Sequence, residues 1–276
     1  MVIYVKDLNS SGVDVFANLT ERELRNNFEK EVGIFIAESP NVIKRAVAAG
    51  YEPISFLMEE KHITGDGAFI SKEFPDLPLY TAERSVLEKI TGYKLTRGVL
   101  GCFKRKNTDC LQQILSSSKR IAVLENIADT SNLGAIFRSA AALNFDAVLL
   151  TPECADPLNR RCLRTSMGNV FNIKWCTIGK LNSDWPENGM KLLKESGFKT
   201  VSMALRKNSV EITDKNLLGE EKLAVILGTE GEGLKNQTID LSDYVVKIPM
   251  KEGVDSLNVA CAATVMFYQL SIFNQK

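Results

Sequence analysis

Three short polar segments in the second half of the chain carry the side chains best suited to chemistry. They are residues 132–138 (NLGAIFR), 228–233 (GTEGEG) and 256–259 (SLNV). The first supplies an amide and a guanidinium, the second supplies backbone groups and a carboxylate, and the third supplies a further amide. Such groups can hold a small neutral or cationic molecule and, beside it, an anion. The sequence therefore predicts a small-molecule site with an anion-facing arginine next to it.

The glycine-rich turn at residues 228–233 follows an apolar run, as a dinucleotide-binding loop does. Its spacing is G-x-x-G-x-G, however, whereas the dinucleotide fingerprint is G-x-G-x-x-G. Glu230 and Glu232 would also repel a pyrophosphate. We therefore expect a cationic or neutral ligand that contacts backbone groups. A tight strand-to-helix turn with solvated glutamates explains the same residues equally well.

Arg138 stands among apolar neighbours in a run that is typical of a helix. A guanidinium in a mainly buried helix needs a carboxylate or a phosphate as partner, and Glu230 is the candidate within the chain. A surface arginine on an amphipathic helix is the alternative. Gly134, on the same helix face, would let a ligand approach closely.

Residues 256–259 open the last predicted helix. Asp255 or Ser256 suits the N-cap, which places Asn258 inside the first turn, where asparagine is a mediocre helix former. The free backbone N–H groups of that turn can hold a ligand. Open α/β sheets bind ligands at the carboxyl ends of their strands. We therefore expect the loops that carry these segments to lie side by side at one edge of a sheet.

The elements that position these segments indicate an α/β protein of two domains, residues 1–115 and 116–276. The first domain mixes strands at 33–37, 53–58 and 77–80 with helices at 20–30, 40–49 and 82–90. In the second, strands at 121–124, 147–150, 173–176, 200–205, 223–227 and 244–248 alternate with helices at 133–143, 159–166, 189–196 and 257–273. Apolar strands between helices are typical of a parallel sheet covered on both faces. Residues 107–119, which hold three consecutive serines, are interpreted as a mobile polar linker.

Composition excludes several classes of protein. The 276 residues carry 34 basic and 34 acidic side chains, so a strongly basic nucleic-acid coat is excluded but a local basic groove is not. Six cysteines without a Cys-x-x-Cys pair and a single histidine, His62, predict no metal site and buried thiols in a reducing compartment. We find no signal peptide and no run near the roughly 20 apolar residues of a membrane span. A cytoplasmic protein is the expectation.

Taken in order, the segments resemble the SpoU (TrmH) class of the SPOUT RNA methyltransferases. Its motifs are N-x-G-x-x-x-R, then G-x-E-G-x-G after a strand, then I-P-M followed by S-L-N-V; here they fall at residues 132–138, 228–233, 248–250 and 256–259. The resemblance implies a parallel α/β domain with a deep trefoil knot, S-adenosylmethionine as cofactor, and a homodimer with active sites at the subunit interface. The cofactor-binding residues that it implies are Gly228, Thr229, Ile248, Met250, Leu257 and Asn258.

The resemblance further implies methyl transfer to a ribose 2′-hydroxyl of RNA, with Arg138 as the catalytic residue. Because a guanidinium hardly ever loses its proton, we expect Arg138 to clamp an RNA phosphate and to stabilise the forming alkoxide. Asn132 and Glu230 would hold Arg138 and the ribose. Ser256 and Asn258 would position the last helix and touch the substrate.

The first domain is similar, more loosely, to the ribosomal-protein-type RNA-binding domain that precedes this catalytic domain in many members. The matching stretches are residues 36–50, 53–58 and 97–101. RNA is expected over Arg97, Lys104, Arg105, Lys106, Arg160, Arg161 and Arg164. The chain after Asn258 has only Lys276 as a basic residue, which favours ribosomal RNA over tRNA. A non-catalytic RNA-binding relative and a nicotinamide-dependent oxidoreductase remain as alternatives.

Overall fold

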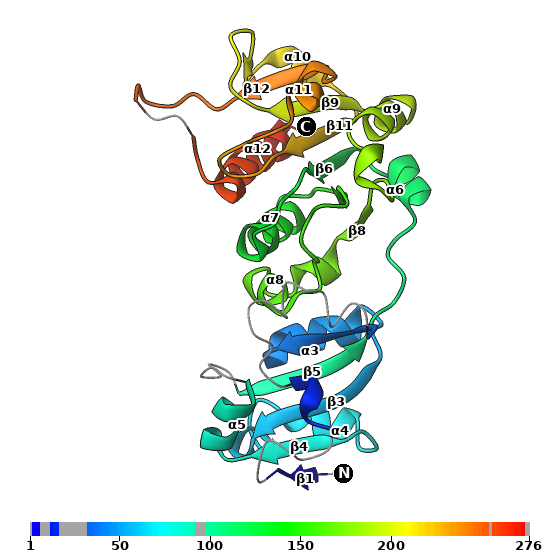
Figure 1. The fold of residues 1–276 in the computed structure, drawn as a ribbon, viewed down its shortest axis with the longest axis vertical. Coiled ribbons are helices and arrows are strands. Elements are labelled where there is room, and N and C mark those ends of the chain that lie inside the picture. The colour runs from blue at the N-terminus through cyan, green and yellow to red at the C-terminus, as the bar shows by residue number, and fades with distance from the viewer. Residues whose placement is uncertain (1, 6–11, 17–31, 92–97, 254–255, 274–276) are drawn as a thin grey trace. The chain divides into compact units, whose positions relative to one another are not determined.

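The chain forms two compact units in the computed structural model, which describes all residues except 1, 6–11, 17–31, 92–97, 254–255 and 274–276 (Figure 1). One unit contains Met1–Asn107 and Leu158–Phe171, and the other contains Thr108–Pro157 and Asn172–Lys276. The chain therefore passes between the units at three points. The helix predicted at 20–30 lies outside the described residues. The functional division at residues 115 and 116 stays a prediction.

The first unit is built on a five-stranded mixed sheet in the order β1-β4-β3-β5-β2. Its strands are β1 Val2–Tyr4, β2 Ile34–Glu38, β3 Pro53–Glu59, β4 Leu79–Ala82 and β5 Val99–Lys104. Its helices are η1 Asp14–Phe16, α3 Pro40–Ala48, η2 Glu60–His62, α4 Ala68–Glu73, α5 Arg84–Thr91, α8 Arg160–Thr165 and η3 Asn169–Asn172. β4 runs parallel to β1 and β3, and β5 runs antiparallel to β2 and β3. The strands predicted at 33–37, 53–58 and 77–80 are confirmed.

The later stretch of chain in the first unit completes its core. The ring of Phe171 lies 5.7 Å from that of Phe35 and 5.1 Å from that of Tyr51. Arg160 is only 7% exposed, and its guanidinium donates to the carbonyl oxygens of Val15 at 2.9 Å and Phe16 at 3.4 Å. The prediction that Arg160 contacts RNA is therefore wrong, because its donors hold α8 against the chain around η1. Spacing within α8 could not show that distant partner.

The second unit is built on a seven-stranded sheet in the order β10-β12-β9-β11-β6-β7-β8, and all its strand pairs are parallel. Its strands are β6 Arg120–Leu124, β7 Ala147–Leu150, β8 Lys174–Thr177, β9 Lys199–Met203, β10 Val210–Glu211, β11 Leu223–Leu227 and β12 Tyr244–Lys247. Its helices are α6 Leu111–Ser117, α7 Thr130–Ala142, η4 Asn182–Asp184, α9 Glu187–Glu195, α10 Lys215–Gly219, α11 Asn236–Asp240 and α12 Val259–Phe273. The predicted parallel α/β domain is confirmed. The trefoil knot is a matter of chain threading that strand order alone does not decide, and it stays a prediction.

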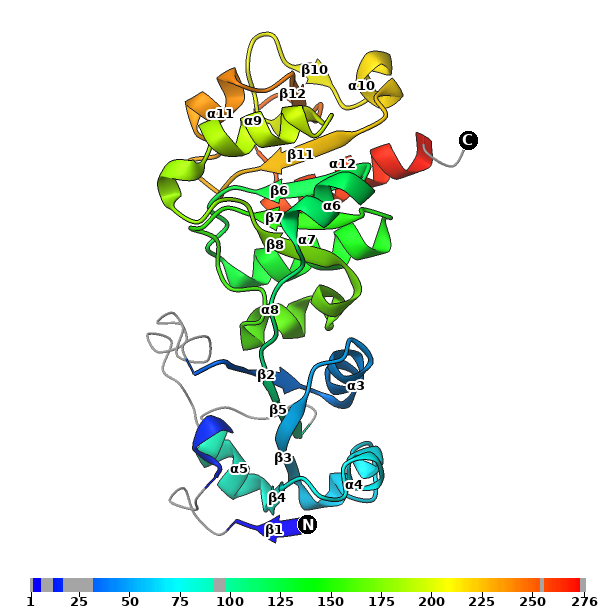
Figure 2. The ribbon, with the colours of Figure 1, turned by 90° about the vertical axis from the view of Figure 1, so that its right-hand side faces the viewer.

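Helices cover both faces of the parallel sheet (Figure 2). Side chains of α6, α9 and α11 share one core cluster with Ile121 and Val123 of β6. On the opposite face α7 lies beside α12, where Ser139 Oγ and Thr264 Oγ1 are 2.7 Å apart. Every residue of the central strands β6 and β11 is buried, as expected for strands covered on both faces.

The predicted linker at residues 107–119 is wrong over most of its length. It contains helix α6, whose Ile114 and Leu115 are buried in the core of the second unit. The serines suggested a mobile joint, yet Ser117 Oγ donates to the Gln113 carbonyl oxygen at 2.7 Å inside the helix. A side-chain hydrogen bond to the preceding turn allows serine to remain in the last turn of a helix.

The thiols only partly match the sequence-based expectation. All six cysteines are free, and Cys102, Cys162 and Cys176 are buried, whereas Cys110 and Cys261 are exposed. Burial raises the pKa of Cys176 to about 12, so this thiol stays protonated. The described residues hold no cluster of His, Cys, Asp and Glu that could bind a metal ion. Among the described helices, none is both long and apolar enough to cross a membrane.

The amino-terminal edge of the parallel sheet is fixed by Asp243, and this contact predicts a pH dependence of stability. Burial by itself would raise the pKa of the Asp243 carboxyl. The Thr200 N–H and hydroxyl donate to this carboxyl at 2.9 Å and 2.7 Å, and Lys194 and Lys199 lie nearby. These donors and positive charges outweigh burial, so the pKa of Asp243 is lower than usual. A lowered folded-state pKa stabilises the protein above about pH 4, and this contribution is lost as the pH falls through the folded-state value.

We therefore expect Asp243→Asn to lower the free energy of unfolding at pH 7 by about 1 kcal/mol. Its stability should also fall less steeply than that of the unchanged protein between about pH 4 and pH 2. Urea unfolding at a series of pH values measures both effects. If the free energy of unfolding fell equally steeply with pH in the two proteins below about pH 4, this role of Asp243 would be contradicted.

Candidate active site

The three polar segments meet at the carboxyl edge of the parallel sheet, around a pocket of about 570 Å³. The pocket lies beyond the ends of β9, β11 and β12 and reaches the start of α12. All six residues predicted to bind a cofactor line it, namely Gly228, Thr229, Ile248, Met250, Leu257 and Asn258. Glu230 and Ser256 line it as well, whereas Asn132 and Arg138 do not.

A single carboxylate joins the three segments. Glu230 Oε1 accepts hydrogen bonds from Asn132 Nδ2 at 3.1 Å and from Asn258 Nδ2. The two amides also bond to each other, because Asn258 Nδ2 donates to Asn132 Oδ1 at 2.9 Å. Residues far apart in the sequence thus form one closed polar triangle at the pocket wall. Charge-assisted hydrogen bonds of this kind fix both position and orientation.

Asn258 also caps helix α12. Its Oδ1 accepts from the Ala260 N–H at 3.0 Å and the Cys261 N–H at 3.2 Å, and the helix begins at Val259. The prediction that Ser256 caps this helix is therefore wrong, since the helix starts later than expected; Asp255 lies outside the described residues. Asparagine is unfavourable within a helix but among the best N-caps, which explains its place here.

The glycines of the acidic turn are needed by its backbone. A Cβ at Gly228 would lie 2.5 Å from the Gly233 carbonyl carbon and from the Leu234 nitrogen. Gly231 and Gly233 have φ of 91° and 71°, which favour glycine, and the Gly233 N–H donates to the Thr229 carbonyl oxygen at 3.1 Å. The same residues form the tight turn and line the pocket, so the two interpretations of this segment are compatible.

Arg138 lies on α7 but not where the sequence placed it. Its side chain is exposed, and within the described part of the chain no hydrogen bond or ion pair holds it. The predicted pairing with Glu230 is wrong: the exposed guanidinium does not reach that carboxylate, whose Oε1 accepts from the two asparagine amides instead. The apolar neighbours of Arg138 face the sheet and α12, while the arginine itself faces outward. An outward guanidinium is free to meet an external anion.

Comparisons with known proteins agree with this geometry. The profile of the SpoU rRNA Methylase family matches residues 119–268. An uncharacterized tRNA/rRNA methyltransferase of Mycobacterium tuberculosis is 34% identical over 273 residues, which cover 96% of this chain and 90% of that protein. This chain belongs to the SpoU family of RNA methyltransferases. The family assignment confirms the resemblance drawn from the three motifs.

Two solved structures share the fold of this SpoU-family chain. The AdoMet-bound rRNA methyltransferase of Sinorhizobium meliloti has a TM-score of 0.80 at 22% identity, and the match covers 98% of this chain and 97% of that one. An RNA 2′-O ribose methyltransferase has a TM-score of 0.81 at 23% identity, with full coverage of both chains. The family uses S-adenosylmethionine as methyl donor. Membership leaves the nicotinamide-dependent alternative without support.

The sequence missed one side of the SpoU-family pocket. Met203, Ala204 and Leu205 line it at the end of β9. They carry no polar signature, so only the rule that ligands bind at the carboxyl ends of parallel strands could have indicated them. Ala204 is held in place because its N–H donates to the Val246 carbonyl oxygen of β12 at 3.0 Å.

The basic positions expected to contact RNA differ in how available they are. Arg105 Nε donates to the Ile34 carbonyl oxygen at 2.7 Å, and Lys106 Nζ donates to that of Ala49 at 2.6 Å. Lys104 pairs with Glu52 at 2.7 Å, Arg164 lies 3.7 Å from Glu38, and Arg161 is exposed. Arg97 lies outside the described residues. RNA contact at these positions stays a prediction.

We expect Asn258→Ala to affect both the helix and the pocket of this SpoU-family protein. Loss of the cap should lower the free energy of unfolding by about 1 kcal/mol. Loss of the bonds to Asn132 and Glu230 should weaken S-adenosylmethionine binding about tenfold in calorimetry. Asp214→Ala is the matched control, because Asp214 caps α10 through the Asn216 and Leu217 N–H groups and does not line the pocket. Equal cofactor affinity in both variants would contradict the role of the polar triangle.

Proposed function

We propose that this protein transfers a methyl group from S-adenosylmethionine to a ribose 2′-hydroxyl of RNA, and that the RNA is ribosomal rather than transfer RNA. The observation that carries the proposal is the convergence of Asn132, Glu230 and Asn258 beside the pocket. The names of similar proteins support it, since one is an RNA 2′-O ribose methyltransferase and another an rRNA methyltransferase bound to AdoMet.

The pocket suits S-adenosylmethionine in size and chemistry. Its volume of about 570 Å³ falls in the usual range for small-molecule sites. The lining combines apolar side chains of Leu205, Ile248 and Met250 with the backbone of the glycine turn. Its acidic residue, Glu230, favours a ligand that carries positive charge near it. When bound, the cofactor supplies an electrophilic methyl group on a sulfonium sulfur.

The residues of the chain then have to position the acceptor oxygen, because in-line displacement depends strongly on alignment. Arg138 binds the phosphate next to the target ribose and stabilises the negative charge that develops on the acceptor oxygen as the bond to the methyl carbon forms. Asn132 and Glu230 hold the ribose, and Asn258 and Ser256 orient the start of α12 toward it. Glu230 shapes this side of the site by way of the two amides rather than by holding Arg138.

Two features outside the pocket support the proposed preference for ribosomal RNA, namely the basic side chains of the first unit and the composition of α12. The first unit has an α/β fold with exposed basic side chains, among them Lys104 and Arg161, that suit phosphate contacts. Helix α12, which follows the third motif, contains no lysine or arginine. Extra arginines in that region would have favoured tRNA. Six free cysteines fit a reducing cytoplasm, where such RNA is modified.

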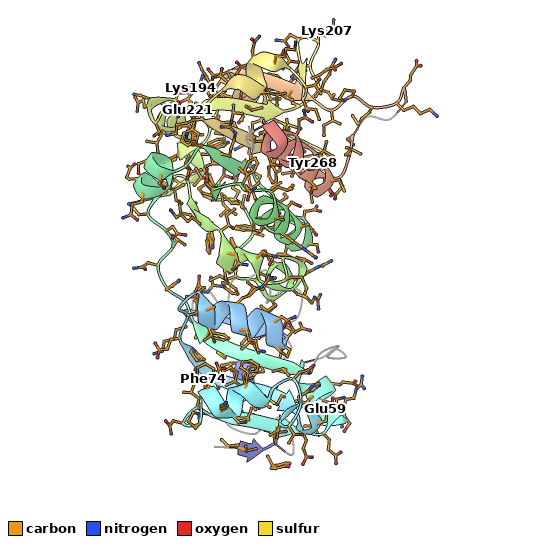
Figure 3. The ribbon with its side chains drawn as sticks, turned by 180° about the vertical axis from the view of Figure 1, so that it is seen from behind. Glu59, Phe74, Lys194, Lys207, Glu221 and Tyr268 are labelled. Carbon is orange, nitrogen blue, oxygen red and sulfur yellow. The ribbon has the colours of Figure 1, made fainter. Side chains whose placement is uncertain are left out.

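We further propose that the protein acts as a homodimer whose interface includes α12. This helix is apolar nearly all round, yet the side chains of Val265 and Tyr268 are exposed, that of Tyr268 at 57% (Figure 3). Apolar helices that are exposed on one side commonly bury that side against another chain. An exposed Arg138 on the neighbouring helix α7 would then lie close to the partner subunit.

Tyr268→Glu tests this interface. A carboxylate in an apolar contact is costly to desolvate, so we expect the dimer dissociation constant to rise at least about tenfold. Sedimentation velocity over a concentration series measures it. Leu181→Glu, at an exposed position beside η4 in the same unit, is the control and should leave association unchanged. A monomeric unchanged protein, or a dimer that ignores Tyr268→Glu, would exclude α12 from the interface.

Arg138→Ala tests the reaction itself. The unchanged protein should bind S-adenosylmethionine in calorimetry and methylate ribosomal RNA, with the product mapped as a 2′-O-methyl nucleotide by mass spectrometry. The variant should keep cofactor affinity but lose about 100-fold or more in methyl transfer, because the forming charge has lost its donor. Arg138→Lys should recover little, since lysine lacks the planar fork. Loss of cofactor binding in Arg138→Ala would refute this role, and cofactor binding without methylation of any RNA would favour a non-catalytic RNA-binding protein.

A further inference from the structure

A second carboxylate lies behind the pocket, and no part of the proposed reaction uses it. Glu125 follows β6 directly, at the carboxyl edge of the sheet, and its exposed fraction is 1%. It does not line the pocket. Burying a carboxylate costs free energy unless its oxygens are hydrogen-bonded, so its partners indicate what it holds in place.

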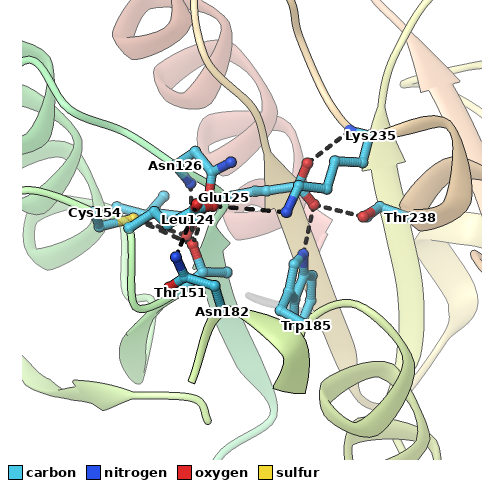
Figure 4. A network of polar contacts seen from close by, with 10 residues as sticks. Leu124, Glu125, Asn126, Thr151, Cys154, Asn182, Trp185, Lys235 and Thr238 are labelled. Carbon is cyan, nitrogen blue, oxygen red and sulfur yellow. Dashed lines mark hydrogen bonds and ion pairs between the residues drawn. The ribbon is translucent and has the colours of Figure 1, made fainter. Parts of the chain in front are cut away.

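Three segments donate to this carboxylate (Figure 4). Trp185 Nε1 donates to Oε2 at 2.5 Å, Thr238 Oγ1 donates to the same oxygen at 2.5 Å, and the Lys235 backbone N–H donates to Oε1 at 2.6 Å. In the described part of the chain, no cationic side chain is bonded to it; Lys235 Nζ instead lies 3.6 Å from Glu153. Three donors match a carboxylate, which only accepts.

Glu125 holds the glycine turn at both of its ends. At the beginning, the Glu125 backbone N–H donates to the carbonyl oxygen of Leu227 at 2.8 Å, immediately before Gly228. At the end, its carboxylate accepts from the Lys235 N–H at 2.6 Å. The turn between these two points includes Glu230, which bonds Asn132 and Asn258 at the pocket wall. The backbone between the two points therefore has little freedom to move.

We propose that Glu125 is a positioning residue that holds the pocket-lining turn from behind and thereby sets the affinity for S-adenosylmethionine. A buried, fully satisfied polar network fixes one arrangement of its segments, which apolar packing alone does less well. Trp185 and α11, which carries Thr238, lie on the far side of this network, so the turn is tied to two elements that do not line the pocket. The inference rests on the proposed function only for the identity of the ligand.

Glu125→Gln is the principal test. The amide keeps the shape of the side chain but turns one acceptor into a donor that faces the N–H of Lys235 or the donors on the other side. We expect the dissociation constant for S-adenosylmethionine to rise about tenfold in calorimetry performed well below the melting temperature. Amide hydrogen exchange at residues 228–235 should also become faster, and this readout needs no ligand.

Asp243→Asn is the matched control for stability. Asp243 is likewise a hydrogen-bonded carboxylate next to β12, but it lies at the opposite edge of the same sheet. This variant should lose stability without changing either cofactor affinity or exchange at residues 228–235. Thr238→Val and Trp185→Phe, which each remove one donor and keep the packing, should weaken binding by about threefold and carry the test if Glu125→Gln does not fold.

The outcomes separate the two proposals. If the unchanged protein does not bind S-adenosylmethionine, the proposed function fails, and exchange at residues 228–235 still decides the role of Glu125. If the unchanged protein binds and the three network variants bind equally well, with exchange no faster than in Asp243→Asn, the positioning role is overturned. Weaker binding and faster exchange in the network variants, with both unchanged in Asp243→Asn, would establish it.

Discussion

The site depends on the carboxylate of Glu230, which two amides share. Asn132 opens α7, Asn258 opens α12, and the turn that carries Glu230 follows β11. One hydrogen-bonded triangle therefore couples the starts of two helices to the end of a central strand. Helices α7 and α12 also pack against each other, and Ser139 of α7 bonds Thr264 of α12. Glu125 adds a second, buried carboxylate beneath the same turn.

The two carboxylates have different roles because their surroundings differ. Glu230 lines the pocket and accepts hydrogen bonds from two neutral amides, of which that of Asn258 also lines the pocket. Glu125 is sealed from water, and its three partners belong to the scaffold. Methyl transfer requires the acceptor atom, the methyl carbon and the sulfur to lie in line. A rigid scaffold behind the pocket wall helps a SpoU-family enzyme to hold that alignment.

The sequence was sufficient to predict the parallel sheet, the three motif segments and most of the pocket. These features are local, since apolar runs, glycine spacing and cap residues act within a few positions of one another. It failed where a partner is distant in the chain. Arg138 was expected to pair with Glu230, Arg160 was expected to contact RNA, and α6 was interpreted as a linker. Glu125 went unnoticed for the same reason, because an acidic residue after a strand carries no sign of its burial or of its three donors.

The path of the chain through Leu158–Phe171 limits how freely the first unit can be exchanged for another domain. This stretch interrupts the methyl-transfer unit between β7 and β8 and places Cys162, Leu163 and Phe171 in the fold of the other unit. Replacing residues 1–107 by an unrelated module would therefore leave the buried side chains of Cys162 and Leu163, and the ring of Phe171 that packs on Phe35 and Tyr51, without their neighbours.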